Sequence, residues 1–153
     1  MNTRKPHTEP FSLDNNSPVY TLGVASQLSE IPAHSIRQYI DMGLLLPYKL
    51  ETKRHLFSQN DIDRLKLIRK LIHDKGLNFS GVRTLMAMIP CWSIRKCSEE
   101  DRSTCGAYIQ NFQPCWEASK KGRLCKNENC RECAVYHSLD LESGIKSTLK
   151  TLL

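Results

Sequence analysis

The spacing of hydrophobic residues in the first half of the chain predicts several short helices and one hairpin. Apolar residues recur at helical spacing in Leu22–Leu28 and again in Ile36–Ile40, with the turn sequence SEIP between them. Two short helices joined by a tight turn are typical of a helix-turn-helix unit. In the next stretch, LLLPYKLETKRHLFS, two apolar runs flank the polar turn ETK, which predicts a small β-hairpin, or wing.

Two further helices follow the predicted wing. Ser58 and Asp61 have the spacing of a capping box, so we expect a helix to begin there. Its apolar stripe is Ile62, Leu65, Ile68, Leu71 and Ile72. We expect Arg64, Lys66, Arg69 and Lys70 on its other faces, where a basic surface in contact with solvent serves solubility. The stretch NFSGVRTLMAMI predicts the second helix, which Pro90 ends. Helical periodicity returns only at the end of the chain, where we expect an amphipathic helix in residues 138–153.

Charge and composition narrow the classes of protein. The formal net charge of +6 favours an anionic partner such as nucleic acid. No run of about 18 apolar residues exists, so we expect no membrane span. Residues 1–18 are polar and lack the apolar region of a signal peptide, which predicts a disordered tail on a cytoplasmic protein. In a reducing cytoplasm, the seven cysteines favour metal ligation or redox chemistry over disulfides.

The order helix, turn, helix, wing, helix, helix resembles the MerR family of bacterial transcription regulators. The resemblance covers residues 19–89 and is carried by YTLGVASQL, IPAHSIRQYIDMGLLLP, RHLFSQNDIDRLKLIRKL and GLNFSGVRTLM. It implies a mainly α fold, with a winged helix-turn-helix domain of four helices and a hairpin that binds double-stranded DNA and has no enzymatic activity. In this family an effector domain resets two DNA-reading heads, which distorts the promoter spacer so that RNA polymerase can use it.

The resemblance also implies which residues contact DNA. On positions that match the family pattern, Arg37 and Tyr39 lie on the helix that enters the major groove, and Arg54 lies in the wing. The residue types agree, because such a helix needs short polar and basic side chains at its exposed start. An alternative for Tyr39 is a purely core role, and His34 is more typical of a plain surface residue. The predicted DNA-binding residues are His34, Ser35, Arg37, Gln38, Tyr39, Lys53 and Arg54.

The chain departs from the family pattern after the fourth helix. MerR-like proteins continue there with a long helix that forms a coiled coil between two subunits, whereas this chain has Pro90 and Cys91. We still expect a homodimer, because a two-fold operator calls for a two-fold protein. Its contact would come from the cysteine region, the terminal helix, or both. The terminal apolar stripe of Leu141, Ile145, Leu149 and Leu152 could equally pack on its own chain.

All seven cysteines lie in an internal duplication. Each copy begins with Cys-Trp, at Cys91 and at Cys115, and ends with Cys-x-x-Tyr. Seven residues separate the second cysteine of each copy from the last, whereas the first gap is five residues in one copy and nine in the other. Cys130 is the additional cysteine and forms a C-x-x-C with Cys133. The pattern of residues 91–136 resembles the "two-CW" cysteine modules attached to bacterial signalling proteins.

The chemistry of these cysteines indicates a metal cofactor. Thiolates select zinc, iron–sulfur clusters or Cu(I), and four thiolates complete a tetrahedral zinc site or a [4Fe–4S] cluster. The wide spacings do not fit a pair of zinc knuckles, which favours an iron–sulfur cluster over zinc. Zinc and a metal-free thiol region remain alternatives, and we expect Trp92 and Trp116 to pack over the site. The candidate ligands are Cys91, Cys97, Cys105, Cys115, Cys125, Cys130 and Cys133.

Together these patterns predict a DNA-binding transcription regulator that a metal or redox signal controls through residues 90–137. Two alternatives belong to other classes. One is a metal-dependent adaptor whose winged helix binds a protein. The other is a redox enzyme that uses Cys130 and Cys133 as a dithiol, although the motif is not set in a βαβ pattern and no obvious base lies beside it in the sequence.

Overall fold

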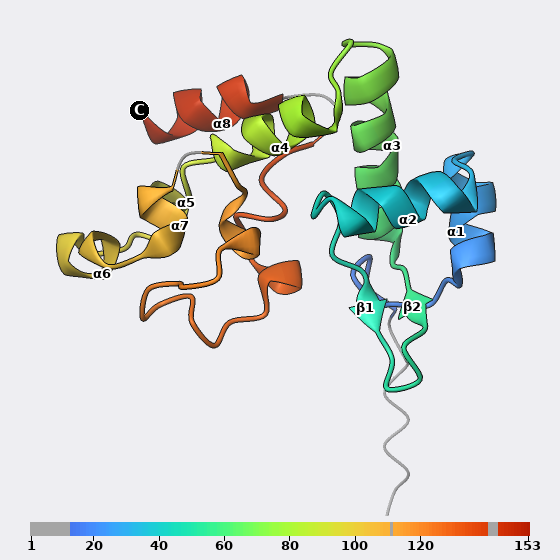
Figure 1. Cartoon of the computed structure of the whole chain (residues 1–153), viewed down its shortest axis with the longest axis horizontal. Helices are drawn as coiled ribbons and strands as arrows, with labels where there is room; N and C mark the ends of the chain where they lie inside the picture. The colour runs from blue at the N-terminus through green and yellow to red at the C-terminus, as the bar shows by residue number, and fades with distance from the viewer. Residues whose placement is uncertain (1–12, 111, 141–143) are drawn as a thin grey trace, which may run out of the picture.

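The computed structural model describes residues 13–110, 112–140 and 144–153. It is mainly helical and has one two-stranded sheet, which confirms the predicted fold class. Within these residues, no helix is both long enough and apolar enough to cross a lipid bilayer. Up to residue 89 the elements are α1 (Leu22–Ser29), α2 (Ala33–Asp41), β1 (Tyr48–Lys49), β2 (His55–Leu56), α3 (Gln59–His73) and α4 (Phe79–Ala87) (Figure 1).

Local signals in the sequence set the ends of α1 and α2. The Thr21 side chain accepts a hydrogen bond from the Val24 N–H and so caps the start of α1. Glu30, with φ +59°, makes the left-handed step that ends this helix. Gly43, with φ +73°, follows α2 and adopts the left-handed conformation that glycine favours. A Cβ at Gly43 would meet the carboxyl group of Glu117, so the absence of a side chain also permits a close approach to the cysteine-rich segment.

A capping box fixes the start of α3. The Ser58 hydroxyl accepts a hydrogen bond from the Asp61 N–H, and the Asp61 carboxylate accepts one from the Ser58 N–H at 2.7 Å, as predicted. Before α3, β1 and β2 pair antiparallel, and Tyr20 joins them through a bridge to Phe57. The predicted hairpin is therefore present and is tied to the N-terminal edge of the domain.

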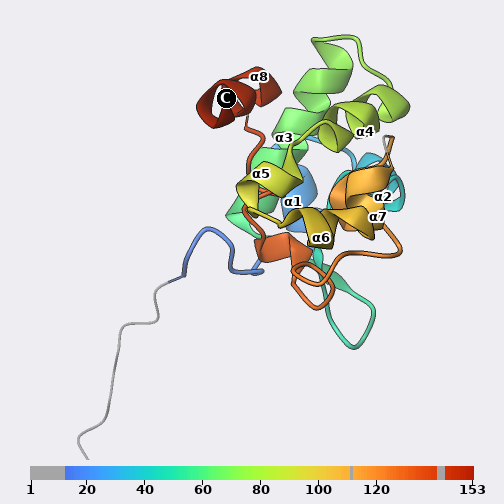
Figure 2. The same cartoon turned by 90° about the vertical axis from the view of Figure 1, so that its left-hand side faces the viewer.

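The duplication in the sequence has a structural counterpart. In the first copy, the rings of Trp92 and Tyr108 meet edge to face, 5.4 Å apart at 83°. In the second copy, Trp116 and Tyr136 repeat this arrangement at 5.1 Å and 83°. The first copy carries the short helices that face the viewer in Figure 2. The elements of both copies are α5 (Cys91–Ile94), α6 (Glu99–Ser103), α7 (Gly106–Ile109), η1 (Cys115–Glu117) and η2 (Cys130–Glu132).

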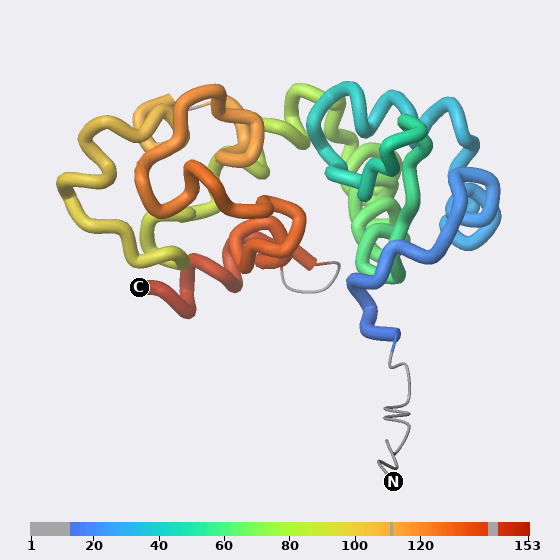
Figure 3. Tube along the Cα trace, turned by 90° about the horizontal axis from the view of Figure 1, so that it is seen from below, coloured from blue at the N-terminus to red at the C-terminus, as the bar shows by residue number. Residues whose placement is uncertain are grey.

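The second copy shares its core with the helix-turn-helix part. Three of its side chains, Trp116, Val135 and Tyr136, are buried together with residues of α2, α3 and α4, and Leu139, just after the copy, joins them. Figure 3 shows the chain from below, with the cysteine-rich part on one side and the helix-turn-helix part on the other. Residues 90–137, which we expected as a separate module, are thus anchored to residues 19–89 through their second half.

The predicted C-terminal helix is present, and α8 spans Gly144–Leu152 within the expected range of residues 138–153. Residues 138–140 are not helical. Leu139 packs into the shared core instead, and Ser138 accepts a hydrogen bond from the Thr148 hydroxyl at 3.2 Å. Burial of Leu139 therefore accompanies an irregular path of residues 138–140. Leu141, part of the predicted stripe, lies outside the described residues.

Part of the predicted tail contacts the domain. The Asn60 N–H donates a hydrogen bond to the Asn15 carbonyl at 2.9 Å, and Arg131 reaches the Asn16 carbonyl at 3.4 Å. Residues 13–18 therefore differ from the disordered tail that we expected, because their carbonyl groups meet donors from α3 and the second copy. The prediction for residues 1–12 lies outside the described residues.

Candidate nucleic-acid interface and cysteine cavity

One face of α2 is available to a large partner. His34, Arg37 and Gln38 are exposed, whereas Ile36 is fully buried on the opposite face. Ser35, at the start of the helix, is partly exposed. The helix thus presents a basic and amide-bearing surface while its apolar side anchors it, which is the arrangement that a groove-reading helix needs.

Tyr39 lies on the buried side of α2. Its ring is only 4% exposed and packs edge to face on Phe79, with the ring centres 5.9 Å apart. Burial raises the pKa of the Tyr39 hydroxyl, and the nearby charge of Arg69 partly offsets this. The packing of the ring agrees with the alternative of a core role, and a phosphate contact through the hydroxyl stays a prediction.

The β1–β2 hairpin carries the other two predicted contacts at its tip. The Leu50 N–H donates to the Arg54 carbonyl at 2.8 Å, which closes a three-residue loop. Lys53 occupies the left-handed position of this loop, with φ +65°. Both Lys53 and Arg54 are exposed, so two cations stand at the end of the hairpin, where a phosphate backbone could pass.

The loop between α2 and β1, residues 43–46, is held by the second copy of the cysteine duplication. The Trp116 indole N–H donates to the Gly43 carbonyl at 2.7 Å. The Leu46 N–H donates to the Tyr136 hydroxyl at 2.8 Å, and Arg131 donates to the Leu46 carbonyl at 2.9 Å. We call residues 43–46 the reader loop, because they join α2 to the hairpin and so fix one against the other.

Arg64 adds a buried cation beneath the reader loop. Its guanidinium donates to the carbonyls of Leu44 at 2.8 Å and Tyr136 at 2.7 Å, and lies 3.8 Å over the Tyr136 ring. Burial lowers the pKa of Arg64, and Tyr136 and Asp61 counteract this. The expectation that Arg64 lies on a solvent-facing side of α3 was wrong. The second copy covers that side, and its carbonyls and rings satisfy the charge.

A second buried ion pair joins α3 to the cysteine-rich segment. Arg131 contacts both carboxylate oxygens of Asp61, at 2.7 and 2.9 Å, and the two side chains are 8% and 2% exposed. His137 contacts the Arg131 carbonyl at 2.6 Å through its Nε2. Because a buried charge is costly when it is unpaired, this pair fixes how η2 sits on α3.

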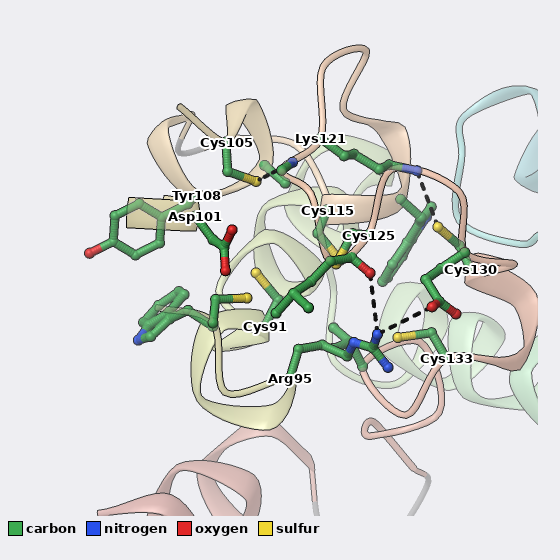
Figure 4. A pocket seen from close by; sticks show the side chains of 18 of the residues that line it. Cys91, Arg95, Asp101, Cys105, Tyr108, Cys115, Lys121, Cys125, Cys130 and Cys133 are labelled. Carbon is green, nitrogen blue, oxygen red and sulfur yellow. Dashed lines mark hydrogen bonds and ion pairs between the residues drawn. The ribbon is translucent and has the colours of Figure 1, made fainter. Parts of the chain in front are cut away.

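All seven cysteines line a single cavity (Figure 4), together with Trp92, Tyr108, Trp116 and Tyr136. The seven thiols are free and each is partly exposed. Both tryptophans pack over the cavity, as expected. Among the described residues, no group of three or more His, Cys, Asp or Glu side chains is placed to hold a metal ion.

Polar groups reach several of the sulfurs. Lys121 donates to the Cys130 Sγ at 3.1 Å, and the Gly122 N–H donates to the Cys105 Sγ at 3.2 Å. A hydrogen bond from Cys115 lowers the pKa of Cys91 to about 7, and the same pairing raises the pKa of Cys115. The pairing therefore stabilises a thiolate, the form that binds metals, at Cys91, whereas burial raises the pKa values of Cys97 and Cys125.

Comparison with known proteins identifies the first part of the chain. Residues 20–89 match the family model described as MerR HTH family regulatory protein. Residues 20–89 are a MerR-family helix-turn-helix domain. Relatives include HspR of Streptomyces coelicolor, 32% identical over 79 residues, and the HTH-type transcriptional regulator GlnR of Bacillus anthracis and of Bacillus cereus, each 34% identical over 73 residues.

The family model ends at residue 89, before the first cysteine of the chain. The matches to relatives span 52% of this chain for HspR and 48% for each GlnR, and cover 52% and 56% of those proteins. The chain thus aligns with about half the length of the curated relatives that it matches. The MerR-type domain is shared with them, and the segment after residue 89 must be interpreted from its own geometry.

Sequence reasoning found the cysteines and the exposed residues of the MerR-type domain but missed the connection between them. The reader loop, Arg64 and Arg131 were absent from the predicted sites. One signal was available for two of the anchoring residues, since Trp116 directly follows Cys115 and Arg131 directly follows Cys130. Arg64 gave no such signal. It lies three residues after Asp61 on α3, but the sequence alone does not show that the second copy covers the face on which both residues lie.

Proposed function

We propose that this protein is a sequence-specific transcription regulator that binds double-stranded DNA with α2 and the β1–β2 hairpin, as a homodimer that acts with RNA polymerase in the cytoplasm. The observation that carries the proposal is the exposed row of His34, Arg37 and Gln38 on the second helix of a MerR-type domain. The cations at the hairpin tip support it, because phosphate contacts position such a helix in the groove.

The test is DNA binding by a variant of the reading helix. A duplex is first selected from a random pool with the intact protein, and affinity is then followed by fluorescence anisotropy. Arg37→Ala should weaken binding by about 1–3 kcal/mol, the cost of losing one base contact. Lys150→Ala, an exposed cation on α8, is the matched control and should leave affinity unchanged. Equal affinity for all three proteins would refute the proposed reading helix.

Binding should also depend on salt. Counterion release makes the affinity of a phosphate-contacting protein fall steeply as salt rises. Lys53→Ala should flatten this dependence with little change in sequence preference, since Lys53 is proposed to meet phosphate. A protein-binding adaptor would show no selected duplex at any salt concentration.

We further propose that a ligand in the cysteine cavity controls DNA reading through the reader loop. Three hydrogen bonds of 2.7 to 2.9 Å tie this loop to Trp116, Tyr136 and Arg131. Two of those residues directly follow the cysteines Cys115 and Cys130 in the chain. A change in ligation at these cysteines would therefore shift residues that set α2 against the hairpin, and the coupling would appear as a change in DNA affinity.

A homodimer without the usual long helix needs another contact. The long helix of the family would start near Pro90, where this chain has only the short helix α5. We therefore propose that the dimer contact comes from the cysteine-rich part, from α8 or from both. Sedimentation of the full chain should give twice the monomer mass, and a variant without α8 shows which part is responsible. A monomer that binds only a single half-site would contradict this part of the proposal.

A further inference from the structure

Five of the seven cysteines form a closed ring of electrostatic neighbours in the cavity. Cys97 interacts with Cys91, Cys125 interacts with Cys97 and Cys133, and Cys115 interacts with Cys91 and Cys133. Cys105 also interacts with Cys97, and Cys130 with Cys115, but these two branch from the ring and do not close it. We call these five residues the thiol ring. It takes two members from the first copy of the duplication and three from the second, so anything bound inside it joins both copies.

The ring offers four ligand positions. Cys91 and Cys115 are hydrogen-bonded to each other, so their sulfurs lie too close together to serve separate metal atoms of a cluster. They act as one position, at which one sulfur binds and the other donates a hydrogen bond. Cys97, Cys125 and Cys133 supply the other three. Four thiolates are what a cysteine-bound [4Fe–4S] cluster requires.

The space inside favours a core of several atoms over a single ion. The free volume of the cavity is about 40 Å³. A cavity needs roughly 10–15 Å³ of such free volume to hold one water molecule, so this cavity has room for about three waters. Among the described residues, no three donors converge on one point, as a tetrahedral zinc site would require. An inorganic core with several metal atoms bridges such separated thiolates.

The cavity wall also has unused hydrogen-bond donors. The Nε atoms of Arg95 and Arg102 are buried without a hydrogen-bond partner, and both side chains line the cavity. Lys121 adds a third cation. Two carboxylates, Asp101 and Glu128, line it as well and are engaged by cations, since Glu128 lies 3.7 Å from Arg95 and Asp101 lies 3.3 Å from Arg123. Cationic and N–H donors of this kind stabilise the negative charge of a thiolate-ligated cluster.

We infer that the thiol ring binds a [4Fe–4S] cluster through Cys97, Cys125, Cys133 and one sulfur of the Cys91–Cys115 pair. The cluster enters by exchange with small thiolate ligands. Each protein thiol bonds to one iron and releases its proton, which the departing thiolate takes up, so no electron is gained or lost. This inference rests on the proposed function, because it names the ligand through which the cavity would control DNA reading.

The test uses the full-length chain and a synthetic thiolate-ligated [4Fe–4S] cluster, mixed without oxygen. After removal of unbound material, the protein should hold iron and acid-labile sulfide in equal amounts and show broad visible absorption. Cys97→Ala and Cys125→Ala should reduce both contents to background. Cys105→Ala is the matched control, because Cys105 lies outside the thiol ring, and it should retain the cluster.

Three results would overturn the inference. They are failure of the intact protein to take up the cluster, retention of the cluster by both Cys97→Ala and Cys125→Ala, and preferential binding of one zinc ion that prevents cluster uptake. Binding to the selected duplex is measured on the same samples and shows that each variant is folded. Failure of the intact protein to take up the cluster while it still binds DNA counts against the thiol ring alone, whereas absence of DNA binding by the intact protein counts against the proposed function.

Discussion

The hydroxyl group of Tyr136 can be removed without disturbing the contacts around its ring. The residue is 1% exposed, and its hydroxyl accepts a hydrogen bond from the Leu46 N–H at 2.8 Å. In a Tyr136→Phe variant, the ring still packs on Arg64 and Trp116, so the change isolates this single hydrogen bond. Leaving the Leu46 amide unpaired should lower the free energy of unfolding by about 1–3 kcal/mol.

The duplication supplies the matched control for this prediction. Tyr108 makes the same edge-to-face contact with Trp92 but is 41% exposed, so Tyr108→Phe should cost no more than about 0.5 kcal/mol. Urea unfolding followed by circular dichroism measures both changes, and fluorescence anisotropy measures DNA affinity. Only Tyr136→Phe should also weaken DNA binding, because only Tyr136 holds the reader loop. Equal effects of the two substitutions would refute the role assigned to the second copy.

Three other predictions test separate contacts. Asp61→Ala should lower the free energy of unfolding by about 3–5 kcal/mol because it leaves the buried Arg131 without its carboxylate and also removes the capping box of α3, whereas the exposed Asp63→Ala should change it little in the same urea titration. In Lys53→Gly, glycine should adopt the left-handed backbone conformation without strain, which should raise the free energy of unfolding by up to about 1 kcal/mol. Loss of the cation should lower DNA affinity, and a decrease in both stability and affinity would contradict the account. In metal-free protein Cys91 should be alkylated fastest, with a rate that rises through pH 7 as its thiolate forms. Cys115→Ala should move that rise to higher pH, as read by mass spectrometry.

Local patterns in the sequence were sufficient to predict the MerR-type domain. The Ser58 capping box and the stripe of α3 each depend on residues a few positions apart, and each appears as expected. The duplication also has a local signature, and the repeated Trp–Tyr pairs follow from it. Short-range spacing thus predicts both halves of the chain separately.

The packing of the two halves against each other depends on long-range contacts that leave no periodic signal. Arg64 and Tyr136 are 72 positions apart, and Gly43 and Trp116 are 73 apart. A charged residue on a helix is normally solvent-exposed, so Arg64 was assigned to the surface. Its burial depends on the carbonyls of Leu44 in the reader loop and Tyr136 in the second copy, which accept its hydrogen bonds. The same long-range packing explains why Leu139 enters the core.

The most direct test of the account compares DNA binding by one protein preparation with the cavity loaded and emptied. Protein carrying the cluster and protein stripped by an anaerobic chelator are each titrated against the selected duplex, and both are checked for folding. We predict that loading changes affinity by at least about fivefold, the lower end of typical coupling between sites. Tyr136→Phe should reduce that change, because it loosens the reader loop. Identical affinities for the loaded and stripped protein, with both folded, would contradict control of DNA reading by the cysteine cavity.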